Sequence, residues 1–304
     1  MTRLRKIVFP FLLLYLLCLS MAGALKGQEL RTGSLKNDGL PQEIALPPQT
    51  VKIIDSVFVL QSGVPQLEMV QVFDLKNGIL VSGKLEYFQK EVLIHTTIDQ
   101  FNKNGNLIES ATTFHLKNST RIFRKKRDEH ENMTQLTTQE NGKERFAYYK
   151  NVYRQNQLAE QRVLSPYTGA VTQTYLYEYD HAGNLKESRR KGGDPNTKTV
   201  FEYNRQNQIT LKQDLKNGQV DEKMLYFYDQ GRLQKTEWYE PLSPVPMTKN
   251  YTYNESGRLV EIRLGKSNDK TEFKDFDEFG NWQTQEQYDS GELSRLTRRK
   301  FLIR

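Results

Sequence analysis

The aromatic and apolar residues of this chain alternate with polar ones in short segments, each of which ends in a turn. Tyr177 and Tyr179 stand two residues apart, and so do Tyr251 and Tyr253. Residues two apart project from the same face of a β-strand, and Tyr, Phe and Thr are residues that favour strands. The spacing of three and four residues that marks an amphipathic helix is absent. The pattern therefore predicts an all-β protein.

These segments repeat at a nearly fixed period, which is typical of repeat architectures. Counted on the second aromatic position, successive copies lie 23 to 28 residues apart, with one double step of 52 residues. A poorly preserved copy of the unit, called the worn copy below, occupies the middle of that double step, with Asp128 in its acidic position. The sequence therefore predicts about nine units with a period of about 25 residues, which lies in the range of known repeat proteins. Apart from the worn copy, the second aromatic positions are Phe73, Phe101, Tyr153, Tyr179, Tyr203, Tyr228, Tyr253 and Phe276.

A turn signal follows the second aromatic residue of most units. A short polar side chain at this point can accept a backbone N–H from two residues further on. Three residues later comes a residue type that tolerates a positive φ, such as Gly183 or Asn207, and a type I turn followed by a left-handed residue commonly joins two strands. Leu185 or its equivalent then begins the return strand. Each unit is therefore predicted to be a β-hairpin, and the polar turn residues are Asp180, Asn204, Asp229, Asn254 and Asp277.

One hairpin of this size buries too little apolar surface to be stable alone. The hairpins must stack edge to edge, with the rings of each unit packed on those of its neighbours, as in solenoid proteins. Cross-strand aromatic pairs would then hold the register. We therefore expect an elongated, twisted antiparallel sheet that curls on itself and exposes its edges mainly at the two ends.

The phrases "YEYDHAGNL", "YFYDQGRL", "YTYNESGRL" and "FDEFGNW" resemble the YD repeats of the Rhs family, and the likeness spans residues 73 to about 290. The family's repeats are β-hairpins that wind into spiral sheets. Nine units are fewer than its toxin-enclosing shells need, so the resemblance implies a small exported bacterial repeat protein. Lys274 replaces the first aromatic residue of the last unit, which suggests a capping hairpin. The MORN-like hairpin repeat, which has a similar period, is an alternative that the Tyr-x-Tyr-Asp pattern favours less.

The N-terminal segment, positions 1–24, has the features of a secretory signal peptide. Arg3, Arg5 and Lys6 precede an uncharged apolar stretch, and Ala22-Gly23-Ala24 supplies the small residues that a signal peptidase requires. We expect cleavage before Leu25, with an uncleaved membrane anchor as the alternative, because the stretch is about 18 residues long. Residues 25–50, rich in Pro and polar residues, are expected to be a flexible linker, and residues 51–304 the repeat domain.

Cysteine usage and charge narrow the function classes. Cys18, the only cysteine, lies within the apolar stretch, so it is either discarded with the signal or lipidated as a membrane anchor. Cleavage at Ala24 would leave no cysteine for a disulfide, a zinc thiolate site or a nucleophile. The formal charge of +7 would fall to +4 once the signal is removed, which is an ordinary balance for solubility and a weak nucleic-acid signal.

No motif in the sequence identifies a catalytic, cofactor or metal site. Asp275, Asp277, Gly280 and Glu286 have the spacing of a calcium-binding EF-hand loop, but Phe279 stands where an oxygen ligand is needed and the flanks are strand-like. The same residues are explained as a repeat turn, so we expect no calcium site. Four histidines are scattered without the spacing of metal ligands, at His95, His115, His130 and His181.

Three basic clusters invite a polyanion hypothesis: residues 124–127, 189–191 and 298–300. We expect them to be solvated faces of the sheet, because the net charge is modest and charged side chains on strands discourage aggregation. No nucleic-acid partner is expected for an exported chain. An envelope glycan, such as an anionic polysaccharide, or an envelope protein is the expected partner, with the membrane reached only through the signal, an anchor or Cys18.

The sequence therefore predicts an exported, non-enzymatic repeat protein that acts as a binding or structural module in the periplasm or at the cell surface. The alternative is a carbohydrate-active enzyme that uses paired carboxylates on one face of the sheet. Such an enzyme would need two converging carboxylates about 5–10 Å apart in a cleft.

Overall fold

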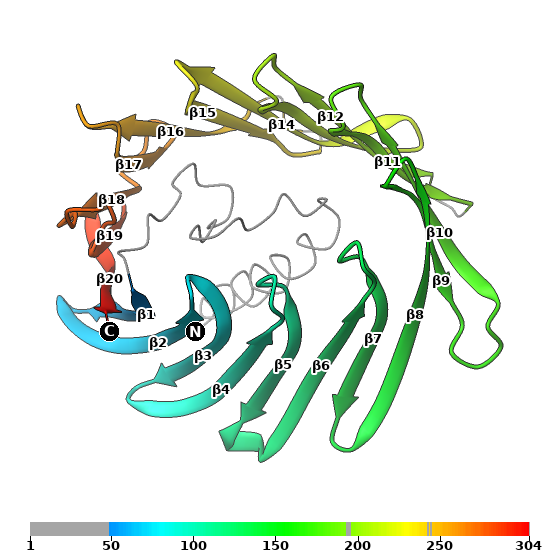
Figure 1. Cartoon of the computed structure of the whole chain (residues 1–304). Helices are drawn as coiled ribbons and strands as arrows, with labels where there is room; N and C mark the ends of the chain where they lie inside the picture. Colours follow the sequence, from blue (N-terminus) through cyan, green and yellow to red (C-terminus); the bar gives the residue numbers. More distant parts are fainter. Residues whose placement is uncertain (1–48, 193–195, 242, 244, 304) are drawn as a thin grey trace, which may run out of the picture.

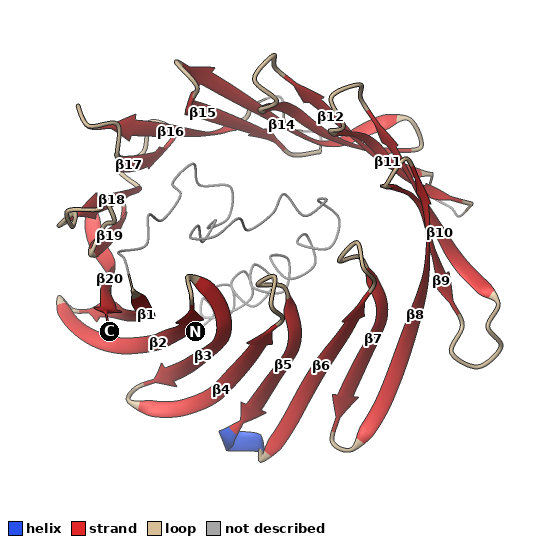
Figure 2. Cartoon of the chain, in the orientation of Figure 1, coloured by secondary structure: helices blue, strands red, loops and turns tan. Residues whose placement is uncertain are grey.

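A single antiparallel sheet of 20 strands contains most of the residues that the computed structural model describes, which are 49–192, 196–241, 243 and 245–303 (Figure 2). One 3-10 turn, η1 (His115–Lys117), joins two of the strands. The predicted signal peptide, Cys18 and all but the end of the predicted linker lie outside the described residues. The strands are β1 (Thr50–Gln61), β2 (Val64–Lys76), β3 (Ile79–Gln89), β4 (Val92–Phe101), β5 (Leu107–Phe114), β6 (Ser119–Arg127), β7 (Met133–Glu140), β8 (Lys143–Arg154), β9 (Gln157–Leu164), β10 (Val171–Tyr179), β11 (Leu185–Lys191), β12 (Thr197–Tyr203), β13 (Ile209–Lys216), β14 (Gln219–Asp229), β15 (Arg232–Tyr239), β16 (Met247–Tyr253), β17 (Leu259–Leu264), β18 (Lys270–Lys274), β19 (Thr284–Asp289) and β20 (Glu292–Ile303).

The sheet closes on itself, so the expectation of an elongated sheet with two open ends is wrong. Each strand pairs with the next, and β20 pairs with β1 from Thr50↔Ile303 to Val59↔Arg295. Figure 1 shows the resulting ring, in which β1 lies beside β20. The right-handed twist accumulates over many strands, and large open sheets tend to curl for this reason. Closure also removes the two unpaired edges that would otherwise template aggregation.

The prediction of nine hairpin units is confirmed within the ring. The strands from β2 to β19 form nine consecutive hairpins, each containing one predicted aromatic position or the worn copy around Asp128. The remaining two strands, β1 and β20, come from opposite ends of the described chain and complete the ring. A regular hairpin repeat therefore builds most of the wall, and one long-range pairing closes it.

The turns follow the predicted chemistry in most units. The Gly183 amide donates to the Asp180 carbonyl at 3.0 Å, and Gly183 has a φ of 85°. The Asn104 amide donates to the side chain of Asn102, two residues earlier, at 2.9 Å. Asp229 is an exception, because its hairpin turns through Gln230 and Gly231, which both have positive φ values. That shorter connection is the two-residue hairpin turn, which matches strand twist in the same way.

The two faces of the sheet differ in chemistry. One, which we call the aromatic face, carries the repeat rings, such as Tyr177, Tyr226 and Tyr251. Tyrosine hydroxyls at the second aromatic position donate to backbone carbonyls of the preceding hairpin, as Tyr253 does to Leu233 at 2.9 Å. The same contact recurs from Tyr203 to Leu185 and from Tyr179 to Leu158. The repeat rings therefore join neighbouring hairpins, as the sequence predicted.

The main buried cluster lies on the aromatic face, near the seam at which β1 and β20 pair and close the ring. Leu259 is 1% exposed and packs with four other buried residues: Leu233, Tyr251, Phe273 and Trp282. The predicted capping role of Lys274 is wrong, because a closed ring has no terminal hairpin. Phe273 supplies the buried ring of this unit instead, one position before Lys274, and the left-handed Asp275 (φ 53°) ends the strand.

A buried ion pair fastens the seam between β1 and β20. Arg299 donates from Nε to Asp55 Oδ1 at 2.7 Å and from a terminal nitrogen to Asp55 Oδ2 at 2.6 Å. The two side chains are only 4% and 10% exposed. The Arg299 guanidinium also lies 3.9 Å from the ring centroid of Trp282. The interpretation of cluster 298–300 as a solvated face is therefore wrong for Arg299, which closes the ring.

Candidate functional site: the ion-pair ladder of the charged face

Three glutamates lie directly opposite one another on adjacent strands. Glu261 of β17 is the cross-strand partner of Glu272 of β18, which in turn is opposite Glu286 of β19. Like charges in this arrangement repel one another and destabilise a sheet unless cations lie between them. The face that carries them, opposite to the aromatic face, is called the charged face below.

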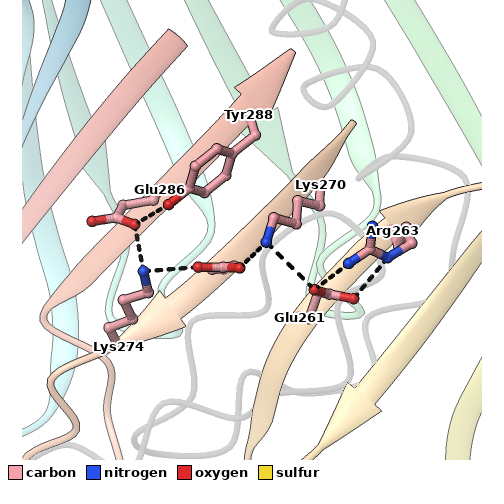
Figure 3. A network of polar contacts seen from close by, with 7 residues as sticks. Glu261, Arg263, Lys270, Lys274, Glu286 and Tyr288 are labelled. Carbon is pink, nitrogen blue, oxygen red and sulfur yellow. Dashed lines mark hydrogen bonds and ion pairs between the residues drawn. The ribbon is translucent and has the colours of Figure 1, made fainter. Parts of the chain in front are cut away.

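Cations occupy the spaces between the carboxylates (Figure 3). Lys274 Nζ lies 2.8 Å from Glu272 and 2.5 Å from Glu286. Lys270 bonds Glu272 and lies 4.0 Å from Glu261. Two further contacts complete this set of residues, which we call the ion-pair ladder. Arg263 binds Glu261 through two nitrogens, and the Tyr288 hydroxyl donates to Glu286 at 2.6 Å.

The ladder favours the ionised form of Glu272 and Glu286. The hydrogen bond from Lys270 lowers the pKa of Glu272, and the hydrogen bond from Lys274 lowers that of Glu286. Conversely, the hydrogen bond to Glu272 raises the pKa of Lys274. A general acid requires the opposite shift, since it must stay protonated near neutral pH. Among the described carboxyl groups whose pKa departs from its ordinary value, the pKa is lowered in every case: Asp74, Asp128, Glu140, Glu160, Asp180, Glu237, Glu272 and Glu286.

Similar ion pairs recur around the ring. On β15, Lys235 lies 2.9 Å from Glu237, two residues away on the same strand. On β9, Arg162 bonds Glu160 with the same spacing. Residues two apart share a face, so this spacing joins opposite charges within one strand. The ladder is thus the densest part of a pattern that many strands share.

The ladder predicts a specific acid sensitivity. A lowered pKa in the folded state means that Glu286 contributes stability above its ordinary pKa, near 4.5, and loses it as the pH falls through the folded-state value. The Glu286→Gln variant should therefore melt below the wild type at pH 7, and the difference should shrink towards pH 3. Thermal melts followed by circular dichroism across this range provide the measurement. A gap in melting temperature that stays constant with pH would contradict the assignment.

The residues with EF-hand-like spacing serve two separate structures. Asp277 caps its turn by accepting from the Asn281 amide at 2.8 Å and from the Asn281 side chain. Glu286, in contrast, belongs to the ladder. Within the part of the chain that the structure describes, no group of three or more His, Cys, Asp or Glu side chains is arranged to hold a metal ion. The absence of a calcium site stays a prediction.

The four histidines lie in different places. His95 stacks on Tyr87 with ring centroids 5.1 Å apart, and burial lowers its pKa. His115 is hydrogen-bonded to Thr96 at 3.0 Å. His130 packs against the ring of Tyr153, and His181 is exposed in the turn after β10.

The other basic clusters are partly paired. Arg124 lies 2.7 Å from Glu109 and 3.8 Å from Glu144. Arg189 lies 3.5 Å from Glu178 and also contacts Glu187. These contacts compensate the charge that made the clusters resemble polyanion sites.

A polar network at the worn repeat is absent from the sequence-based predictions. The Tyr153 hydroxyl donates to Asp128 Oδ2 at 2.5 Å. The Asn132 side chain donates to the Tyr153 hydroxyl, and the Asn151 side chain donates to the Asp128 carboxylate. Burial, and then the hydrogen bond to Asp128, raise the pKa of Tyr153. A signal exists in the sequence, because Asn132 stands four residues after Asp128, as Asn184 does after Asp180. In both turns the amide of the later residue donates to the earlier carboxylate.

One shallow cavity of about 260 Å³ opens beside the turn between β18 and β19. Phe279, Phe301 and Ile303 supply its apolar lining, and Asp277 and Glu278 its carboxylates. Both Asp277 oxygens accept from the Asn281 side chain, so this carboxylate is committed to its turn.

No helix among the described residues is long and apolar enough to cross a membrane.

Comparisons with known proteins place the chain in no established family. No family model and no curated protein matches it. Among solved structures, it is similar to the crystal structure of TcdB2-TccC3-Cdc42, with 13% identity over 83% of this chain and 19% of that one, and a TM-score of 0.29. It is also similar to the Photorhabdus luminescens Tc holotoxin pore, with 13% identity over 84% of this chain and 17% of that one, and a TM-score of 0.30. A porin-like protein from Bacteroides uniformis is 10% identical over 84% of this chain and 98% of that one, with a TM-score of 0.32.

These similarities are too low to assign a function. The chain spans less than a fifth of the length of the toxin chains that it matches. The all-β hairpin architecture is confirmed by the fold itself, while membership of the Rhs family stays a prediction.

Proposed function

We propose that this protein is exported and acts at the bacterial cell envelope as a non-enzymatic binding or structural module. The observation that carries the proposal is the ion-pair ladder, in which Glu261, Glu272 and Glu286 are each bonded by a cation. Export rests on the signal-like character of positions 1–24 of the sequence.

The ladder favours a binding or structural module over a glycosidase. Canonical glycoside hydrolysis uses two carboxyl groups, of which the general acid must begin protonated. Lys270 and Lys274 hold the pKa values of Glu272 and Glu286 low, which is the wrong direction for a general acid. Compensated charges instead give a stable polar surface.

The closed sheet supports a structural role in the same way. Every strand from β1 to β20 is paired on both sides, so the ring presents no edge to a second chain. The buried Asp55–Arg299 pair holds this closure. Such a wall offers two extended faces of different chemistry on a continuous hydrogen-bonded frame.

The test combines export, binding and turnover. The full chain, expressed in a Gram-negative host, should be recovered from the envelope or periplasmic fraction with the mass of a chain that begins at Leu25. The purified protein should then sediment with isolated envelope polymer without releasing reducing ends. Retention in the cytoplasm, or failure to associate with any envelope fraction, would contradict the proposal.

Two variants make the turnover part decisive. Glu272→Gln removes a ladder carboxylate, and Glu160→Gln removes a carboxylate paired with Arg162 on distant β9. Release of reducing ends by the wild type that is abolished by the first variant and kept by the second would establish the enzyme alternative. The proposal expects no release from any of the three proteins.

A further inference from the structure

Two aromatic side chains on β8 are exposed in a way that the repeat rings are not. Phe146 and Tyr148 are each 37% exposed. Their rings are nearly parallel, with an interplanar angle of 11° and centroids 6.2 Å apart. Both project from the charged face. Phe146 stands four residues and Tyr148 two residues before Lys150, so all three share a face, and the cross-strand partner of Lys150 is the ion-paired Arg162. They are therefore free of the inter-hairpin role that the repeat rings have on the aromatic face.

Apolar residues on the next two strands extend this exposed surface. Leu164 of β9 is directly opposite Tyr148, and Val171 of β10 is directly opposite Leu164. Val171 is 51% exposed. Since cross-strand partners share a face, these residues form one surface, which we call the β8 patch: Phe146, Tyr148, Leu164 and Val171. Contiguous exposed apolar surface of this kind marks interaction sites in soluble proteins.

Polar side chains frame the β8 patch. Gln135 is the cross-strand partner of Tyr148, and its amide nitrogen donates to Thr137, which is opposite Phe146. Gln139, two residues further along the same strand, accepts from Arg124 at 3.3 Å. Ligand sites typically combine apolar and aromatic area with a small number of polar groups. The patch has this composition.

Three acidic and three basic side chains surround the β8 patch, and one of them, the exposed Lys150 two residues from Tyr148, has no ion pair among the described residues. On one side, Arg124 pairs with Glu109 at 2.7 Å and lies 3.8 Å from Glu144. On the other side, Arg162 bonds Glu160. The patch itself carries no charged side chain. An anionic or cationic ligand would gain little from these surroundings, so the electrostatics favour an uncharged one.

We propose that the β8 patch binds an uncharged glycan through its pyranose rings. The C–H-rich faces of a pyranose pack on aromatic rings, and its hydroxyl groups suit the amides and the hydroxyl that frame the patch. Phe146 and Tyr148 supply the stacking surface. This inference rests on the proposed function, for which it names the ligand class and the place of binding. The repeat tyrosines are a poorer stacking surface, because they are half-buried and their hydroxyls are bonded to neighbouring hairpins.

The test is titration calorimetry of the full chain with a hexamer of N-acetylglucosamine as the uncharged probe. Phe146→Ala/Tyr148→Ala should weaken its affinity at least tenfold, while Tyr148→Phe, which keeps the ring, should stay within about twofold of the wild type. Phe227→Ala is the matched control, because this ring is 39% exposed on β14 and covered by Lys235 at 4.2 Å. It should bind like the wild type. A heparin-derived hexasaccharide should bind more weakly than the uncharged probe.

Several outcomes would overturn the inference. Equal affinity of the double variant and the wild type would exclude the patch while leaving the proposed envelope role standing. Preference for the heparin fragment would exclude an uncharged ligand. A concentration-dependent dimer in analytical ultracentrifugation that the double variant abolishes would make a second copy the occupant. Binding of the envelope fraction with no affinity for the uncharged hexamer would also reject the inference, whereas loss of all envelope association would reject the proposed function itself.

Discussion

Asp55→Ala is expected to lower the free energy of unfolding by about 3–5 kcal/mol, the range for removing one partner of a buried ion pair. The substitution leaves the Arg299 guanidinium at the seam, where its side chain is 4% exposed, without its carboxylate. Trp282 remains over the guanidinium at 3.9 Å but cannot neutralise it. Because this pair joins β1 to β20, the loss should fall on the closure of the ring.

Equilibrium urea unfolding measures this loss as a shift in the midpoint. Asp74→Ala is the matched control, since Asp74 lies on β2 and pairs with Lys52 of β1 at 2.9 Å. Those two side chains are 40% and 44% exposed. An exposed pair contributes little, so the control should lose no more than about 1 kcal/mol. Equal losses in the two variants would show that the buried pair does not fasten the seam.

Leu259→Ala is expected to lower the free energy of unfolding by about 2–5 kcal/mol. Leu259 is 1% exposed and lies among the rings of Tyr251, Phe273 and Trp282. Truncation removes apolar contact and leaves a cavity, which the paired strands on either side cannot easily close.

The same chemical change at an exposed site separates burial from other effects. Leu116, in η1, is 70% exposed, and Leu116→Ala should leave the urea midpoint nearly unchanged. A midpoint for Leu259→Ala that matches the wild type would mean that the rings do not form a packed core. Such a result would remove the physical basis for hairpin stacking on the aromatic face.

Local features made the hairpins predictable. Most units have a polar turn residue, a left-handed residue and paired aromatics within about ten positions, and these short-range preferences act wherever the segment lies. Asp180 and Gly183 form the expected contact, and the same holds at Asn254 and Gly257. The worn copy around Asp128 forms a hairpin too, because the turn and the pairing of β6 with β7 need no aromatic residue.

The candidate site was less predictable, because strand bulges change which residues share a face. Leu185 and Glu187 stand two residues apart, yet a bulge pairs Leu185 with Tyr179 and Glu187 with Glu178. Leu185 is therefore buried with the rings, while Glu187 joins the charged face. The alternation of the sequence does not show where it is interrupted, so the ladder of Glu261, Glu272 and Glu286 could not be assembled from spacing alone.

The sequence by itself determined the all-β character, the nine hairpins, their turns and the joining role of the repeat tyrosines, since each depends on residues close together in the chain. The tertiary structure alone decided that the sheet closes, that Arg299 is buried against Asp55 and that glutamates of three strands share one ladder. Asp55 and Arg299 are 244 residues apart, and their meeting depends on twist summed over the whole ring. No local pattern encodes that sum, because each strand pair contributes only a small part of it.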